Sequence, residues 1–268
     1  MSREKELAYR YDLFITPDWR DRFDQIVDEN IELPVEARIL DVNCGTGAHA
    51  IAIGDRLKNG EVLAIDPDQE RINIARAKAE IAKVKRVNFE CGDTFALPYA
   101  TGEFDAVIGD GSLLAADQIE HLLIEMVRVA RPGARIVLKI ASHGSLDEFF
   151  SVYWEALHEC GIDDAVWDKL RSLIEERRTI SQAEDLGARA GLRDVQAFSK
   201  KEEFLFESGS DFLSSPLIED IFLNGWFEIV PEHQRQEVRS RITAIIDRDR
   251  HGAPFDVSVK ATVVSGVK

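Results

Sequence analysis

Short apolar runs alternate with amphipathic segments along the first half of the sequence. The runs with the length and composition of strands are Arg38–Val42, Glu61–Asp66, Arg86–Cys91, Phe104–Gly109 and Arg135–Ile140. The segments between them that carry apolar residues at helical spacing are residues 48–58, 68–83 and 117–130. Strands separated by helices predict right-handed βαβ units and a parallel sheet with both faces covered.

The pattern changes after residue 145. Helical spacing is expected over residues 146–160, 165–178 and 181–190, and over residues 211–250 with breaks near Gly225 and Pro231. Residues 194–207 and 254–268 alternate as strands, and we expect them to pair antiparallel at one sheet edge. The predicted fold is therefore α/β: a doubly wound, mostly parallel seven-stranded sheet with an antiparallel C-terminal edge strand and a helical insertion between the last two strands.

No linker divides the sequence, so we expect a single domain over residues 1–268. Residues 1–36 are helical and rich in aromatic side chains, and we interpret them as a lid that ends at Pro34. Residues 37–142 are the expected cofactor-binding core. Residues 143–268 are the expected C-terminal part, with helical insertions at about 145–190 and 209–250.

Composition narrows the function classes. The formal net charge of −16 disfavours nucleic acid and anionic membrane surfaces as partners. No stretch approaches the roughly 18 apolar residues of a membrane-spanning helix, and the charged start is unlike a signal peptide. The three cysteines lack metal-type spacing, so we expect no metal site, reduced thiols and a cytoplasmic protein.

The turn after the first strand carries the candidate chemistry. Gly45 and Gly47, followed by Ala50, match the permissive nucleotide-binding pattern G-x-G-x-x-A. Asp66 ends the next strand 19 residues after Gly47, where a carboxylate accepts hydrogen bonds from ribose hydroxyls.

Asp41 separates two kinds of cofactor. It ends the first strand beside the glycines, where it would repel a pyrophosphate by roughly 1 to 4 kcal/mol at about 4 Å. S-adenosylmethionine has no phosphate and brings a positive sulfonium and ammonium, together with a carboxylate suited to a helix N-terminus. The acidic strand end favours that ligand.

Four segments in order carry a resemblance to a known family. They are Ile39–Gly47, Val62–Pro67, Gly92–Pro98 leading to Glu103–Asp105, and Arg128–Ala134. Over roughly residues 36 to 142 the sequence resembles the class I S-adenosylmethionine-dependent methyltransferases, whose first motif reads L-D-x-G-C-G-T-G. One position departs from that motif, because Asn43 stands where the family has glycine. If φ is positive there, asparagine is the least costly substitute.

The resemblance implies a role for each matching residue. Asp41 and Gly45 would contact the methionine part of the cofactor, Asp66 the ribose, and Asp93 with Thr94 the region of the adenine amine. Asp110, Gly111 and Ser112 would line the methyl-transfer cleft. The full set of expected cofactor-binding residues is Asp41, Asn43, Gly45, Gly47, Asp66, Pro67, Asp93, Thr94, Asp110, Gly111 and Ser112. The implied cofactor is S-adenosyl-L-methionine, with S-adenosyl-L-homocysteine as product.

The acceptor is less defined by sequence. The residues after the fourth strand lack the Asn-Pro-Pro-Tyr signature of amino-group methylation on nucleobases or glutamine. The C-terminal layout is similar to that of methyltransferases acting on quinone precursors or related metabolites, so we expect a small, partly apolar acceptor. His143 is the candidate general base. The candidate substrate-binding residues are Tyr11, Phe14, Trp19, Phe204, Phe206 and Trp226.

Two other functions remain open from the sequence. The same glycine turn suits an NAD-dependent oxidoreductase. Asn43 and the unusual C-terminal insertions also allow a protein that binds adenosylmethionine or a partner without catalysis.

Overall fold

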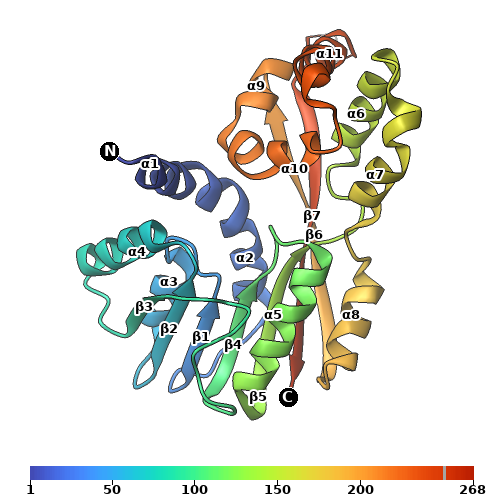
Figure 1. Cartoon of the computed structure of the whole chain (residues 1–268). Coiled ribbons are helices and arrows are strands. Elements are labelled where there is room, and N and C mark those ends of the chain that lie inside the picture. Colours follow the sequence, from blue (N-terminus) through green and yellow to red (C-terminus); the bar gives the residue numbers. More distant parts are fainter. Residues whose placement is uncertain (250–251) are drawn as a thin grey trace. The chain divides into compact units, whose positions relative to one another are not determined.

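Seven strands form one sheet in the computed structural model, which describes residues 1–249 and 252–268 (Figure 1). The strands are β1 Arg38–Val42, β2 Glu61–Asp66, β3 Val87–Cys91, β4 Phe104–Asp110, β5 Ala130–Ala141, β6 Arg193–Phe206 and β7 Phe255–Val267. Their order is β3-β2-β1-β4-β5-β7-β6, and the four pairs among β1 to β5 are parallel. The mostly parallel α/β sheet predicted from the alternation of strands and helices is confirmed.

The C-terminal strand is antiparallel to its neighbour β5, as predicted, with Arg135 opposite Val267 and Ala141 opposite Ala261. The prediction that this strand forms the edge of the sheet is wrong, because β7 lies between β5 and β6, and β6 forms the edge. Burial explains the order. β7 is buried at nearly every position from Val257 to Ser265, whereas β6 is largely exposed and carries charged side chains. Charged, exposed strands suit the edge of a sheet.

The strand predicted at Arg135–Ile140 begins five residues earlier in the structure, so residues 131–134 lie inside β5. The pairing of β4 with β5 shifts register here, since Phe104 pairs with Ala130 and Ala106 pairs with Arg135. Gly133 takes a φ of 85°, a conformation that glycine adopts at little cost. The Pro-Gly sequence therefore makes a bulge that lets the strand continue.

Helices cover both faces of the sheet. Those that flank or precede it are α1 Arg3–Arg10, the π-helix η1 Tyr11–Arg20, α2 Asp21–Asn30, α3 Ala48–Arg56, α4 Gln69–Ala82, α5 Ala116–Val129 and α8 Ile180–Arg189. Buried residues of α5 and α8 pack in one apolar cluster with Leu40, Val107 and Leu138, and Figure 1 shows α5 in front of the strands.

The opposite face carries charge. Asp41 is in register with Ile108 and Val137, and Asp110 pairs with Lys139 two residues further along. Because side chains alternate along a strand, Asp41, Asp110 and Lys139 all point to this second face. It is the face on which Asp24 of α2 meets Lys139.

The chain forms two compact units. Unit 1 comprises Met1–Ala141, Thr179–Lys200 and Ala261–Lys268, and unit 2 comprises Ser142–Arg178 and Lys201–Lys260. The helices of unit 2 are α6 Asp147–Glu159, α7 Asp163–Glu175, α9 Gly209–Ser214, the π-helix η2 Leu217–Phe222, α10 Leu223–Phe227, the 3₁₀-helix η3 Glu232–Gln234 and α11 Arg235–Asp249. Among the described residues, no helix is long and apolar enough to cross a membrane.

Candidate functional site

The turn between β1 and α3 is built on three residues with positive φ. These are Asn43 at 58°, Gly45 at 58° and Gly47 at 77°. A Cβ atom on Gly47 would lie 2.5 Å from Cε1 of Phe89, so this position has no room for a side chain. The backbone N–H of Gly45 donates to Oδ2 of Asp66 at 2.8 Å. Two residues singled out by the sequence motif therefore lie within one hydrogen bond of each other.

Asn43, which replaces the glycine of the family motif, takes the left-handed conformation that asparagine tolerates best after glycine. Its side chain adds a contact that glycine cannot make, since Nδ2 donates to the backbone oxygen of Asp110 at 2.9 Å. Its own carbonyl accepts from Nη2 of Arg20 at 2.7 Å. Asn43 thus ties the turn to the carboxyl end of β4 and to η1.

Asp66 lies at the carboxyl end of β2, next to an open groove. Its Oδ1 accepts from the backbone N–H of Asp68 at 3.0 Å, and its Oδ2 from Gly45, so the carboxylate is held by two backbone donors. The neighbouring groove has a volume of about 630 Å³ and is lined by Glu4, Pro67, Asp68, Gln69, Glu70 and Arg71. This is the region that the motif predicts for the ribose and its surroundings.

Asp93 and Thr94 follow β3 and differ in burial. The carboxylate of exposed Asp93 accepts from the backbone N–H of Phe95 at 2.8 Å, which closes a local turn, while Thr94 is buried. Asp93 is thus exposed at the carboxyl end of the sheet, where parallel sheets bind their ligands.

Asp41 is fully buried, and neither of its carboxylate oxygens has a hydrogen-bond partner among the described residues. Burial raises the pKa of Asp41 above its ordinary value, and the charges of Lys139, His49 and Arg20 oppose that rise. A buried, unpaired carboxylate is costly unless a cation compensates it. The turn therefore fits a positively charged ligand better than a pyrophosphate.

Asp110 is held as an anion at the end of β4. Its Oδ1 accepts from the backbone N–H of Ser112 at 2.9 Å and from the Ser112 hydroxyl at 2.6 Å. Its Oδ2 lies 3.1 Å from Arg20 and 3.5 Å from Lys139. Burial alone would raise the pKa of Asp110, but these two cations lower it to about 2. Asp110 is thus a fixed negative charge rather than a proton acceptor.

Gly111 continues this strand end, and its backbone N–H donates to the oxygen of Lys139 at 2.9 Å. A Cβ atom there would lie 3.2 Å from a side-chain carbon of Ile119. The segment after β4 is therefore tightly packed between β5 and α5.

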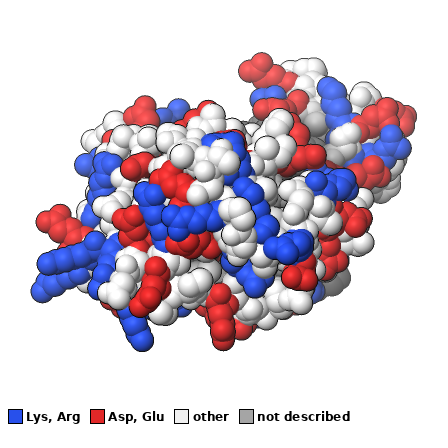
Figure 2. Space-filling model, turned by 90° about the horizontal axis from the view of Figure 1, so that it is seen from below, with Lys and Arg blue, Asp and Glu red and all other residues white. Residues whose placement is uncertain are grey.

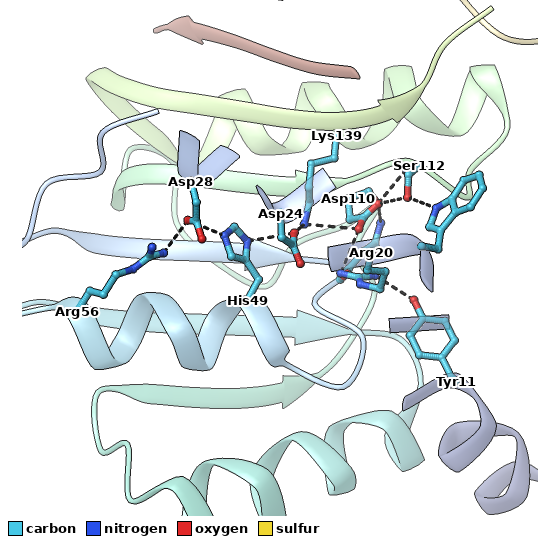
Figure 3. Close-up of polar contacts among 11 residues, drawn as sticks. Tyr11, Arg20, Asp24, Asp28, His49, Arg56, Asp110, Ser112 and Lys139 are labelled. Atoms are coloured by element: carbon cyan, nitrogen blue, oxygen red, sulfur yellow. Dashed lines mark hydrogen bonds and ion pairs between the residues drawn. The ribbon is translucent and has the colours of Figure 1, made fainter. Parts of the chain in front are cut away.

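The N-terminal helices lie directly against the glycine turn (Figure 3). Trp19 donates from Nε1 to the Ser112 hydroxyl at 2.9 Å, and Arg20 donates from Nη1 to the Tyr11 hydroxyl at 3.0 Å. A Cβ atom on Gly45 would lie 3.0 Å from the Tyr11 ring. The structure therefore brings Tyr11 and Trp19 to the predicted cofactor turn. Phe14, from the same segment, is exposed.

Three charged residues of this site were missed in the sequence. Arg20, Asp24 and Lys139 are all buried, and they link η1, α2 and β5. Lys139 did carry a signal, because a lysine inside the apolar run Ile136–Ile140 must find a carboxylate when the strand is buried. Nothing in the sequence identifies Asp24 as that carboxylate.

The remaining candidates belong to unit 2, each in a different setting. His143 is exposed, and its backbone N–H donates to the oxygen of Arg178 at 2.8 Å. Phe204 is buried, and Phe206 meets Phe212 edge-on. Trp226 is buried and stacks on Phe149 with ring centres 4.1 Å apart. Trp226 therefore has a packing role in unit 2.

Comparisons with known proteins agree with this geometry. Residues 39–133 match the family model described as methyltransferase domain. The demethylmenaquinone methyltransferase of Shouchella clausii is 34% identical over 117 residues, which cover 43% of this chain and 49% of that protein. The chain thus spans about half the length of the curated relatives that it matches.

Solved structures show the same fold over most of the chain. YcgJ from Bacillus subtilis aligns with a TM-score of 0.60 at 17% identity, covering 92% of this chain and 98% of that one. Phosphoethanolamine N-methyltransferase 2 from Haemonchus contortus, solved with phosphomonomethylethanolamine and S-adenosylhomocysteine, aligns with a TM-score of 0.57 at 15% identity. That alignment covers 97% of this chain and 57% of that one.

Proposed function

We propose that this chain is a class I S-adenosylmethionine-dependent methyltransferase that methylates a small, partly apolar molecule, because residues 39–133 match a methyltransferase domain and the similar curated proteins are methyltransferases. The observation that carries the proposal is the glycine turn, whose Gly45 N–H meets the Asp66 carboxylate beside an open groove at the strand ends.

We assign the cofactor contacts to residues of unit 1. Asp66 and Pro67 would hold the ribose end, with Asp93 and Thr94 near the adenine, and the turn from Asn43 to Gly47 would receive the methionine end. The unpaired Asp41 carboxylate supports a cationic ligand. When bound, S-adenosylmethionine supplies a methyl group on a positively charged sulfur. Tyr11 and Trp19, already packed at this turn, would act as a lid that excludes water from the reacting atoms.

We propose a quinone-type ring as the methyl acceptor, since the similar curated proteins are named demethylmenaquinone methyltransferases. Methyl transfer is an in-line displacement, in which the protein chiefly aligns the two reactants. The acceptor atom must also lose a proton. Asp110 is a poor candidate to accept that proton, because it is held ionised at a pKa of about 2 and is a weak base. Phe14, exposed on η1, is the proposed apolar contact of the ring in unit 1.

We propose a cytoplasmic enzyme with no nucleic-acid partner. All three cysteines are free, which fits a reducing compartment. Figure 2 shows basic and acidic side chains interspersed on the face that it displays, as on an ordinary solvated surface.

The test is calorimetric titration of the protein with S-adenosylhomocysteine and, separately, with NAD. We expect S-adenosylhomocysteine to bind and Asp66→Asn to weaken its affinity by about 10-fold to 100-fold, the scale of lost charge-assisted hydrogen bonds. The matched control is Asp168→Asn, a highly exposed aspartate on α7. Tight NAD binding without S-adenosylhomocysteine binding would refute the proposal in favour of an oxidoreductase.

The acceptor needs a second measurement. We expect mass spectrometry to detect a mass gain of about 14 Da in a demethylated quinol incubated with S-adenosylmethionine and the protein, since one methyl group replaces one hydrogen atom. Cofactor binding without turnover of any acceptor in a broad metabolite screen would support the non-catalytic alternative.

A further inference from the structure

Asp12 joins three elements at the glycine turn. It is the second residue of η1, and its Oδ1 accepts hydrogen bonds from the Thr46 hydroxyl at 2.6 Å and from Nζ of Lys78 at 2.6 Å. Thr46 is buried in the turn between Gly45 and Gly47, and Lys78 lies on α4. One carboxylate oxygen therefore ties η1 both to the turn and to α4.

The hydrogen bonds of Thr46 have a defined direction. A hydroxyl has one proton to donate and a carboxylate only accepts, so the Thr46 proton points to Asp12. Thr46 must then accept the hydrogen bond that joins it to the hydroxyl of Thr16, a further residue of η1, at 3.2 Å. The Asp12 carboxylate thus orders two links between η1 and the turn, and its own two bonds are charge-assisted.

Tyr11, which precedes Asp12 in the sequence, covers the turn. A Cβ atom on Gly45 would lie 3.0 Å from Cε1 of the Tyr11 ring, and the guanidinium of Arg71 on α4 lies 3.8 Å from the centre of that ring. Carbon atoms in contact lie about 3.5 to 4.0 Å apart, so no ligand atom fits between Gly45 and Tyr11. A ligand reaches this side of the turn only when η1 moves away, and that movement must break both bonds of Asp12.

We propose that Asp12 is a positioning residue for the cofactor: it fastens η1 over the glycine turn and thereby sets how fast S-adenosylmethionine enters and leaves. The inference rests on the proposed function, since it takes the turn to be the cofactor site. Asp12 bonds protein groups alone, so the same bonds close the turn before and after the cofactor binds. A contact that is equal in both forms changes the rates of exchange and leaves the affinity nearly unchanged.

The experiment measures the binding kinetics of S-adenosylhomocysteine. Dissociation is followed by chasing radiolabelled ligand with an excess of unlabelled ligand, and association by rapid filtration at several protein concentrations. We expect Asp12→Ala to raise both rate constants about tenfold, the scale of one charge-assisted hydrogen bond, with a dissociation constant within about threefold of the wild-type value. The matched control is Asp18→Ala, at an exposed aspartate of the same helix, which should keep the wild-type rates.

Ionic strength gives a second readout. The side chains of Asp12 and Lys78 are 20% and 32% exposed, so dissolved salt screens their ion pair in part. Between about 0.05 M and about 0.5 M sodium chloride, we expect both wild-type rate constants to rise about threefold and those of Asp12→Ala to stay constant. Lys78→Met should also give rates that do not depend on salt, with a smaller rise than Asp12→Ala because the Thr46 bond remains.

A double variant tests whether the two side chains act as one unit. Asp12→Ala combined with Lys78→Met should exchange ligand no faster than Asp12→Ala alone, because the ion pair is already lost in the single variant. If Asp12→Ala does not fold, Lys78→Met and the wild-type salt series decide the matter without it.

Rates for Asp12→Ala equal to those of Asp18→Ala would overturn the role of Asp12. Faster dissociation without faster association would overturn it too, because that result indicates a lost cofactor contact or lost folded protein rather than an opened turn. So would wild-type and Lys78→Met rates that are equal and independent of salt. If the wild-type protein does not bind S-adenosylhomocysteine at all, the proposed function itself is refuted.

Discussion

Replacing Lys139 with methionine removes the positive charge that lies between Asp24 and Asp110, while keeping the length and most of the volume of the side chain. The ammonium is fully buried, 2.6 Å from Asp24 and 3.5 Å from Asp110. At an effective dielectric constant of about 20, two unit charges about 2.6 Å apart attract by roughly 6 kcal/mol. Desolvation of the lysine offsets part of this attraction in the native protein.

The expected loss in free energy of unfolding is about 3 to 5 kcal/mol, the range for removing one partner of a buried ion pair. We expect the lower end, because Arg20 still faces Asp110 and His49 still faces Asp24. The assay is urea denaturation followed by circular dichroism, read as a shift in midpoint at constant slope. The matched control is Lys201→Met, which removes an exposed lysine 3.3 Å from Glu203 and should cost less than about 1 kcal/mol.

A double variant separates the lost charge from lost packing. Lys139→Met combined with Asp24→Leu leaves no unpaired charge between α2 and β5, so it should recover at least about half of the loss. A loss below about 1 kcal/mol in Lys139→Met would refute the reasoning. So would a double variant whose loss is the sum of the two single losses, because additivity means that the two side chains do not interact.

Three further predictions concern the glycine turn. Gly47→Ala should destabilise the protein by about 2 to 4 kcal/mol in urea denaturation, because its Cβ would lie 2.5 Å from Phe89 at a φ of 77°; an unchanged midpoint would contradict this packing. Asn43→Gly should cost about 1 kcal/mol for the lost hydrogen bond to Asp110, and Asn43→Leu should cost more in the same assay, since leucine also strains the left-handed backbone. Asp41→Asn should stabilise the protein at neutral pH by about 1 to 3 kcal/mol, because it removes an unpaired buried charge. The pKa of Asp41 is raised in the folded state, so its stabilising contribution is full below the ordinary value and is lost as pH rises. The gain from Asp41→Asn should therefore shrink in denaturation curves taken at acid pH, and a gain independent of pH would count against the assignment.

The sheet could be predicted because each βαβ unit leaves a local signature. The strand Arg38–Val42 is followed by a glycine turn, and α4 begins where Asp68 accepts from the N–H groups of Glu70 and Arg71. Such signals are local, and the structure keeps nearly the same boundaries. The bulge in β5 was missed, because a Pro-Gly pair reads as a turn and the pairing with β4 that extends through it is not local.

The candidate site, too, could be predicted only where its residues follow from local signals. Gly45, Gly47 and Asp66 follow strand ends at fixed spacing, so their meeting at one edge of the sheet follows from the fold. The contacts among the buried charged residues do not follow from the fold in this way. Those residues, Asp24, His49, Asp110 and Lys139, come from four separate elements. Only their packing shows which charge faces which. A lysine inside a buried strand indicates that a carboxylate partner exists. That Asp24 is this partner of Lys139 depends on how α2 crosses the sheet.

Trp19 has a consequence for optical work on this protein. Its buried indole donates to the Ser112 hydroxyl at 2.9 Å, and the other three tryptophans, Trp154, Trp167 and Trp226, all belong to unit 2. Trp19 is thus the single tryptophan of unit 1, located where η1 meets the end of β4. With the three unit 2 indoles replaced by phenylalanine, emission wavelength and quenching by acrylamide would report the detachment of the N-terminal helices in solution, without any label.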